Sequence, residues 1–110
     1  MPAPRHFLYL IKPTRSTFIN DMTPEEEAVI EEHFAYLKGL LGDDRLVFAG
    51  PCLDGAFGVV VLEVESEETA FQLMMEDPSV RAGVMAPELH PFRLSLSRQQ
   101  PGAGSDQAAE

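Results

Sequence analysis

Two segments of this chain carry apolar side chains in both directions along an extended backbone, and they constrain the fold more than any other feature. Residues 57–64, with Val or Leu at every position from 59 to 62, give the strongest strand signal in the sequence. Residues 6–12 are almost continuously apolar, with Phe7, Tyr9 and Ile11 on one face and two leucines on the other. We therefore expect two strands that are each covered on both faces.

A first helix is predicted from residue 24 to residue 42. Residues 23–26, Thr-Pro-Glu-Glu, provide an N-cap hydroxyl, a proline at the first helical position and a glutamate placed to complete a capping box. Apolar side chains then recur at three- and four-residue steps up to position 41, and Gly42 is well placed to end the helix. His33 is the one ionisable side chain on this apolar stripe. The solvent-facing side carries Glu27, Glu31 and Lys38.

A second, shorter helix is predicted to begin after Ser66. The Ser66 hydroxyl can cap the helix, and two glutamates follow it, where the helix dipole favours negative charge. Asp77 and Pro78 end this helix, because the residue before a proline is disfavoured in the helical region. One further helical turn is predicted from Pro78 to Val84.

The remaining segments are two short strands and a loop. Residues 46–49 form a strand that is predicted to stop at Gly50 and Pro51, because proline lacks the N–H of a central ladder. The turn residues at 54–56 then predict a hairpin with the strand at 57–64. The last strand is expected at 92–96, and residues 13–22 form a long loop of the kind that often lines a site.

These elements predict one α+β domain at residues 1–97, in the order β-α-β-β-α-β. Right-handed crossovers place both helices on the same face of the sheet, so another surface must cover the second face. Self-association through the sheets is the simplest candidate, and we expect a homodimer. Residues 98–110 are rich in Gly, Ala, Gln and Ser, and we expect them to be a disordered tail.

Composition argues against several classes of partner. With 18 acidic and 8 basic side chains, the formal net charge is -10, which would repel nucleic acid and anionic membranes. The apolar run at residues 7–11 is too short for a membrane span or for the core of an export signal. Cys52 is the single cysteine, which fits a reducing, cytoplasmic location and excludes a cysteine-based zinc site.

Three short motifs lie in order along this pattern: His33 within His-Phe-Ala-Tyr-Leu, then Gly50-Pro51, then Asp77-Pro78. In order and spacing, over residues 6–96, the chain resembles the YciI-like (YCII-related) family. The resemblance implies a ferredoxin-like α+β fold with a four-stranded antiparallel sheet and dimers of the α/β-barrel type. It also implies a pocket near a His–Asp pair, here His33 and Asp77, with Gly50 and Pro51 as substrate-binding residues.

His33 and Asp77 each have a structural alternative. His33 could be a core histidine bonded to a backbone carbonyl. Asp77 could simply cap the short helix that begins at Pro78. If the two side chains pair instead, Asp77 fixes the tautomer of His33 and leaves the second ring nitrogen to move a proton.

Other candidate groups have weaker support. Arg15, in the long loop, could bind an anionic substrate, although exposed loop arginines usually do not. Cys52 has no neighbouring base to activate it as a nucleophile. A metal site at His33 is not expected, because the positions one helical turn away are apolar or Tyr. His6 and His90 are expected to face solvent or a partner.

The family resemblance implies proton-transfer chemistry for two reasons. The family includes an enzyme that removes HCl from a chlorinated hydroquinone-type intermediate, and the family's fold is similar to that of muconolactone isomerases. Our hypothesis is a cofactor-independent lyase or isomerase that acts on a small, cyclic, oxygenated organic acid, with His33 as base or acid and Asp77 orienting it. The alternative is a non-catalytic module that binds a small ligand in the same pocket.

Overall fold

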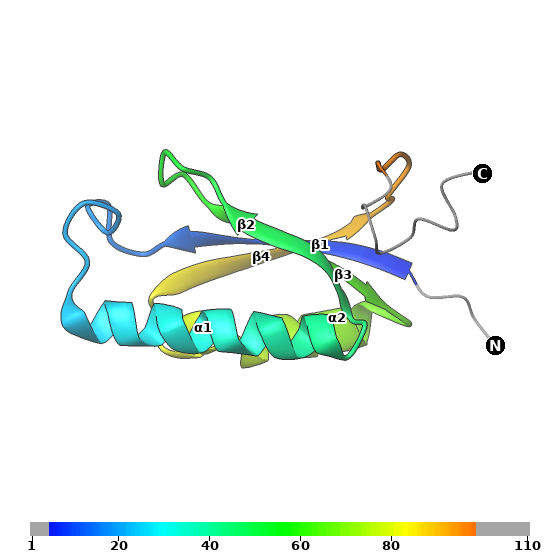
Figure 1. The fold of residues 1–110 in the computed structure, drawn as a ribbon, viewed down its shortest axis with the longest axis horizontal. Coiled ribbons are helices and arrows are strands. Elements are labelled where there is room, and N and C mark those ends of the chain that lie inside the picture. Colours follow the sequence, from blue (N-terminus) through cyan, green and yellow to red (C-terminus); the bar gives the residue numbers. More distant parts are fainter. Residues whose placement is uncertain (1–4, 99–110) are drawn as a thin grey trace.

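The computed structural model describes residues 5–98 and has the predicted α+β architecture (Figure 1). Its elements are β1 (Arg5–Pro13), α1 (Pro24–Gly42), β2 (Leu46–Pro51), β3 (Gly58–Val64), α2 (Glu67–Glu76), α3 (Pro78–Arg81) and β4 (Met85–Phe92). The four strands form one sheet in the order β2-β3-β1-β4, and every neighbouring pair is antiparallel. The two strands with apolar side chains on both faces, β1 and β3, are therefore the central strands.

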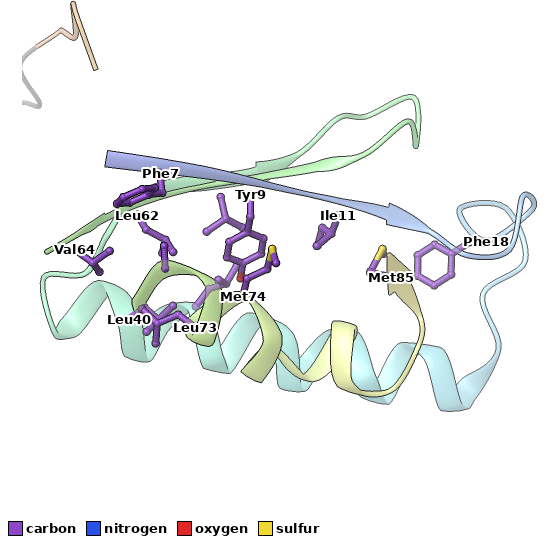
Figure 2. Packing of buried hydrophobic residues seen from close by; sticks show 13 residues of the cluster. Phe7, Tyr9, Ile11, Phe18, Leu40, Leu62, Val64, Leu73, Met74 and Met85 are labelled. Atoms are coloured by element: carbon purple, nitrogen blue, oxygen red, sulfur yellow. The ribbon is translucent and has the colours of Figure 1, made fainter. Parts of the chain in front are cut away.

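The core lies between the sheet and the helices, which cover one face (Figure 1). Alternation along β1 turns Phe7, Tyr9 and Ile11 toward the helices, and Figure 2 shows these side chains above Leu73 and Met74 of α2. All five are buried. Burial of this continuous apolar layer supplies the main stabilisation of the fold.

Both long helices begin where the sequence predicts. The Thr23 side chain accepts a hydrogen bond from the backbone of Glu26, and the Glu26 side chain accepts one from the Thr23 backbone, which completes the capping box. Ser66 caps α2 through the backbone of Thr69. The helical turn after Pro78 is shorter than predicted, ending at Arg81 and not at Val84.

The predicted last strand at 92–96 is wrong, because β4 spans Met85–Phe92. It pairs with β1 from His6 to Pro13. Prolines at 87 and 91 weaken the strand signal there, yet β4 is an edge strand and its missing N–H groups can face away from the ladder. The same reasoning explains why β2, at the opposite edge, continues through Gly50 and Pro51 and does not stop before them.

Two expectations concern parts of the chain outside this fold. The disordered tail was predicted at residues 98–110, and all of it except residue 98 lies outside the described residues. Within residues 5–98, no helix combines the length and apolar character that crossing a membrane requires.

The second face of the sheet carries apolar side chains and, within residues 5–98, no helix. Leu8 and Leu10 of β1 point to this face and are half-buried. Phe48 of β2 pairs with Val61 on the same face and is 50% exposed. An apolar sheet face of this kind is typical of a protein–protein contact.

We expect this face to mediate a homodimer. Leu10→Lys should weaken dimerisation at least about tenfold, because the change buries a charge in the contact. In a monomer the lysine can pair with Glu88, the cross-strand neighbour of Leu10. Light scattering at micromolar concentration measures the change. Phe71→Lys, at an exposed position of α2, is the matched control and should leave the dimer intact. A monodisperse wild-type monomer would contradict the expectation.

Candidate active site

A cavity of about 620 Å³ lies between α1 and the strands β1, β2 and β3. Its volume is in the range typical of small-ligand sites. The walls are mostly apolar and include Ile11 of β1, Ile30 and Leu37 of α1, and Val59 and Val60 of β3. The cavity can therefore hold a small organic molecule against largely apolar walls.

Two loops meet beside the cavity and contribute to its wall. Ile19, from the loop between β1 and α1, packs closely on Gly55, from the loop between β2 and β3. A Cβ atom at Gly55 would lie 3.0 Å from Ile19 Cγ2, and the backbone there has φ of +80°. Glycine is needed at this position because both the close contact and the positive φ disfavour a side chain.

His33, from the middle of α1, forms part of the cavity wall and bonds to Asp77. Its Nδ1 lies 2.8 Å from Asp77 Oδ1 and 2.9 Å from Asp77 Oδ2. An ionised carboxylate only accepts hydrogen bonds, so Nδ1 must carry the proton. Nε2 is then the unprotonated ring nitrogen, the one that can accept a proton.

Asp77 is fully buried and accepts hydrogen bonds from two other residues. The Tyr9 hydroxyl donates to Oδ2 at 2.7 Å. Ser79 donates to Oδ1 twice, from its backbone N–H at 2.9 Å and from its hydroxyl at 2.8 Å. Together with His33, these donors come from β1, α1 and α3, so one carboxylate joins three elements.

The hydrogen bonds decide the charge of Asp77. Burial by itself raises the pKa of the Asp77 carboxyl. Other effects outweigh burial and hold that pKa below its ordinary value: the hydrogen bonds from His33 and Tyr9, the charge of His33, and the hydrogen bond from Ser79. Asp77 is therefore ionised at neutral pH. Burial and the Asp77 charge raise the pKa of Tyr9 far above its usual range, so Tyr9 stays a hydrogen-bond donor.

The structure brings His33 and Asp77 together as the sequence suggested and also shows the alternative role of Asp77. Asp77 caps α3 through the Ser79 backbone while it bonds His33, and both contacts involve Oδ1. His33 Nδ1 faces a carboxylate, not a backbone carbonyl as the alternative for His33 supposed. Gly50 and Pro51 line the cavity from β2, on the edge opposite β4.

Arg15 lies apart from these residues and is not among those that line the cavity. Its guanidinium bonds Glu26 through Nε, at 3.1 Å, and through Nη2, and it bonds Asp21 through Nη1 at 2.7 Å. The Arg15 hydrogen bond, with help from the Thr23 backbone, lowers the pKa of Glu26 to about 2. These contacts hold the loop against the start of α1, and a role for Arg15 in binding an anion stays a prediction.

Tyr9, Ser79 and Lys38 are site residues that sequence reasoning missed. Alternation along residues 6–12 placed Tyr9 on a covered face with Phe7 and Ile11, and a buried tyrosine hydroxyl usually has a polar partner. Lys38 is exposed, as its assignment to the solvent-facing side of α1 predicts, and it also lines the cavity. Cys52 also lines the cavity and is half-buried. Within residues 5–98, no group of three or more His, Cys, Asp or Glu side chains is arranged to hold a metal ion.

Comparison with known proteins identifies the family and the fold. Residues 6–93 match the family model of the YCII-related domain. No curated protein matches the chain. Among solved structures, one similar chain is 5-chloro-2-hydroxyhydroquinone dehydrochlorinase from Burkholderia phenoliruptrix AC1100, in complex with 2,5-dihydroxybenzoquinone. The two structures align with a TM-score of 0.60 and 18% sequence identity, and the alignment covers 79% of this chain and 93% of that chain. At this identity the likeness shows the fold alone.

The lowered pKa of Asp77 predicts how its contribution to stability depends on pH. The folded protein holds the Asp77 proton less tightly than the unfolded chain does, so this contribution is present above about pH 4 and is lost as the pH falls through the lower, folded pKa. Asp77→Asn should cost about 3 kcal/mol at pH 7, because it leaves buried donors without their charged partner. Urea unfolding should show a smaller difference from wild type at about pH 3.

Glu31→Gln removes one negative charge from an exposed position and serves as the control, with little expected change at either pH. A difference between wild type and Asp77→Asn that is constant or larger at low pH would show that the Asp77 carboxylate does not have this role.

Proposed function

We propose that this chain, which belongs to the YCII-related domain family, is a cofactor-independent lyase or isomerase that moves a proton on a small, cyclic, oxygenated organic acid. The observation that carries the proposal is the His33–Asp77 pair at the wall of an apolar cavity. His33 is the proton-transferring group, and Asp77 orients it.

The proposed first step is transfer of a proton from a substrate carbon to His33 Nε2. The bonding electrons stay on the substrate, and His33 becomes an imidazolium beside the Asp77 carboxylate. The buried negative charge of Asp77 stabilises this cation. Tyr9 and Ser79 keep the carboxylate in place, so it can stabilise the new charge without rearranging.

The second step depends on the substrate. If a leaving group such as chloride stands next to the carbanion, the electron pair forms a double bond and the leaving group departs, which is an elimination. If none is present, the imidazolium returns the proton to another carbon, which is an isomerisation. Both outcomes need one base that faces the substrate, as His33 can.

The apolar walls support proton transfer of this kind. A substrate seated against apolar walls displaces water from around the reacting carbon, and the lower polarity strengthens the attraction between the imidazolium and Asp77. The similar dehydrochlorinase was solved with a hydroxylated quinone, which supports a substrate of related class here. We also propose that the active form is a cytoplasmic homodimer, in keeping with the apolar second face of the sheet and the single cysteine.

A non-catalytic ligand-binding module is the second candidate. The apolar lining favours it, because such walls bind a ring well whether or not a reaction follows. A panel of lactones and halogenated hydroxyquinols separates the two functions. Conversion of a panel member supports the enzyme, whereas binding without conversion across the panel supports the module.

His33→Asn tests the base directly. The asparagine amide can still donate to Asp77 but has no basic nitrogen, so turnover should fall by about 10³-fold. The melting temperature should stay within a few degrees of wild type because the contact with Asp77 is kept. Gln72→Asn, at an exposed position of α2 outside the cavity, is the control and should keep full activity. Substantial turnover by His33→Asn would exclude His33 as the base.

A further inference from the structure

We propose that Lys38 selects an anionic substrate and holds its oxyanion at the rim of the cavity, across the cavity-facing side of α1 from His33. The inference rests on the proposed function, because it concerns the same cavity and assigns the group that recognises the substrate. Lys38 acts in binding and orientation, whereas His33 moves the proton.

The charges around the cavity favour an anion. The chain has 18 acidic side chains, but no Asp or Glu is among the residues that line the cavity. The basic side chains that line it are His33 and Lys38. Because the net charge of -10 repels anions and salt screens distant charges, a cation at the cavity itself decides whether an anion can bind.

Helix geometry places the two basic residues on opposite flanks of the cavity-facing side of α1. Lys38 is five positions after His33, which corresponds to a rise of about 7.5 Å and a rotation of about 140° between their Cα positions. Ile30, Leu37 and Leu41 lie between them around the helix and line the cavity. A ring that rests on these apolar side chains can reach His33 with one edge and Lys38 with the other.

The Lys38 ammonium is held near the cavity and is free of ion pairs within the described part of the chain. Its Nζ lies 4.9 Å from the ring centroid of Phe34, one helical turn earlier, which also lines the cavity. Helical side chains lean toward the N-terminus, so this contact brings the charge toward the turn that carries His33. No carboxylate of residues 5–98 lies within 4.0 Å of Lys38, whereas Arg15 is bound by two.

Calorimetric titration of the full-length chain with two compounds tests the proposal without requiring turnover. One compound is 2,5-dihydroxybenzoquinone, which is an anion at neutral pH, and the other is its uncharged dimethyl ether. Wild type should bind the anion at least about tenfold more tightly than the ether, and Lys38→Met should lose this preference. Methionine keeps the length of the lysine stem, so loss of packing is small. Added salt should weaken binding of the anion to wild type and leave Lys38→Met almost unchanged.

Two further variants act as controls. Lys12→Met removes the same charge from the other lysine of the chain, which is exposed and does not line the cavity, and should keep the preference. Lys38→Arg keeps the charge and should bind the anion within about threefold of wild type.

The proposal is wrong if wild type shows no preference for the anion, including the case in which neither compound binds, or if Lys38→Met keeps the preference. The outcome of this binding test is independent of the outcome of the test for catalysis. A Lys38-dependent preference in a chain that converts nothing would contradict the catalytic proposal alone. Turnover combined with unchanged anion binding by Lys38→Met would contradict only the role of Lys38.

Discussion

The buried carboxylate of Asp77 is the interaction on which both the fold near the cavity and the proposed chemistry depend. A buried charge costs several kcal/mol unless it is paired and hydrogen-bonded. Here Tyr9, His33 and Ser79 satisfy it, and no buried side-chain N or O atom of residues 5–98 lacks a partner. These donors hold β1, α1 and α3 together, so the contact that stabilises the carboxylate also orients His33 at the cavity wall.

The cavity follows from how the two long helices pack on one sheet. Apolar side chains fill the space between the sheet and α2, where Leu73 and Met74 meet β1 and β3 (Figure 2). Along α1 the space toward β2 is left partly empty, and that space is the cavity. An apolar cavity with one basic nitrogen next to a buried carboxylate suits proton transfer. The role proposed for Lys38 would add selection among substrates.

Local patterns predicted most of the fold, because helix caps and apolar periodicity act over a few residues. The starts of both long helices, the central strands and the His33–Asp77 contact, suggested by family resemblance, all agree with the structure. The sequence failed at β4, where two prolines hid a tolerated edge strand. It also missed Tyr9 as a donor to Asp77, because that contact joins residues 68 apart and no local pattern encodes it. The Ser79 backbone bond is the helix cap that the alternative role of Asp77 predicts, whereas the Ser79 hydroxyl was not foreseen. Lys38 is exposed, as predicted, and no local pattern showed that it also lines the cavity.

The tautomer of His33 tests the central claim most directly. Long-range proton–nitrogen NMR of the neutral imidazole distinguishes a ring protonated at Nδ1 from one protonated at Nε2. If Asp77 holds the ring as described, wild type should be protonated at Nδ1 and unprotonated at Nε2. Asp77→Asn should lose this preference, because the amide can donate to the ring. A wild-type ring protonated mainly at Nε2 would contradict the account.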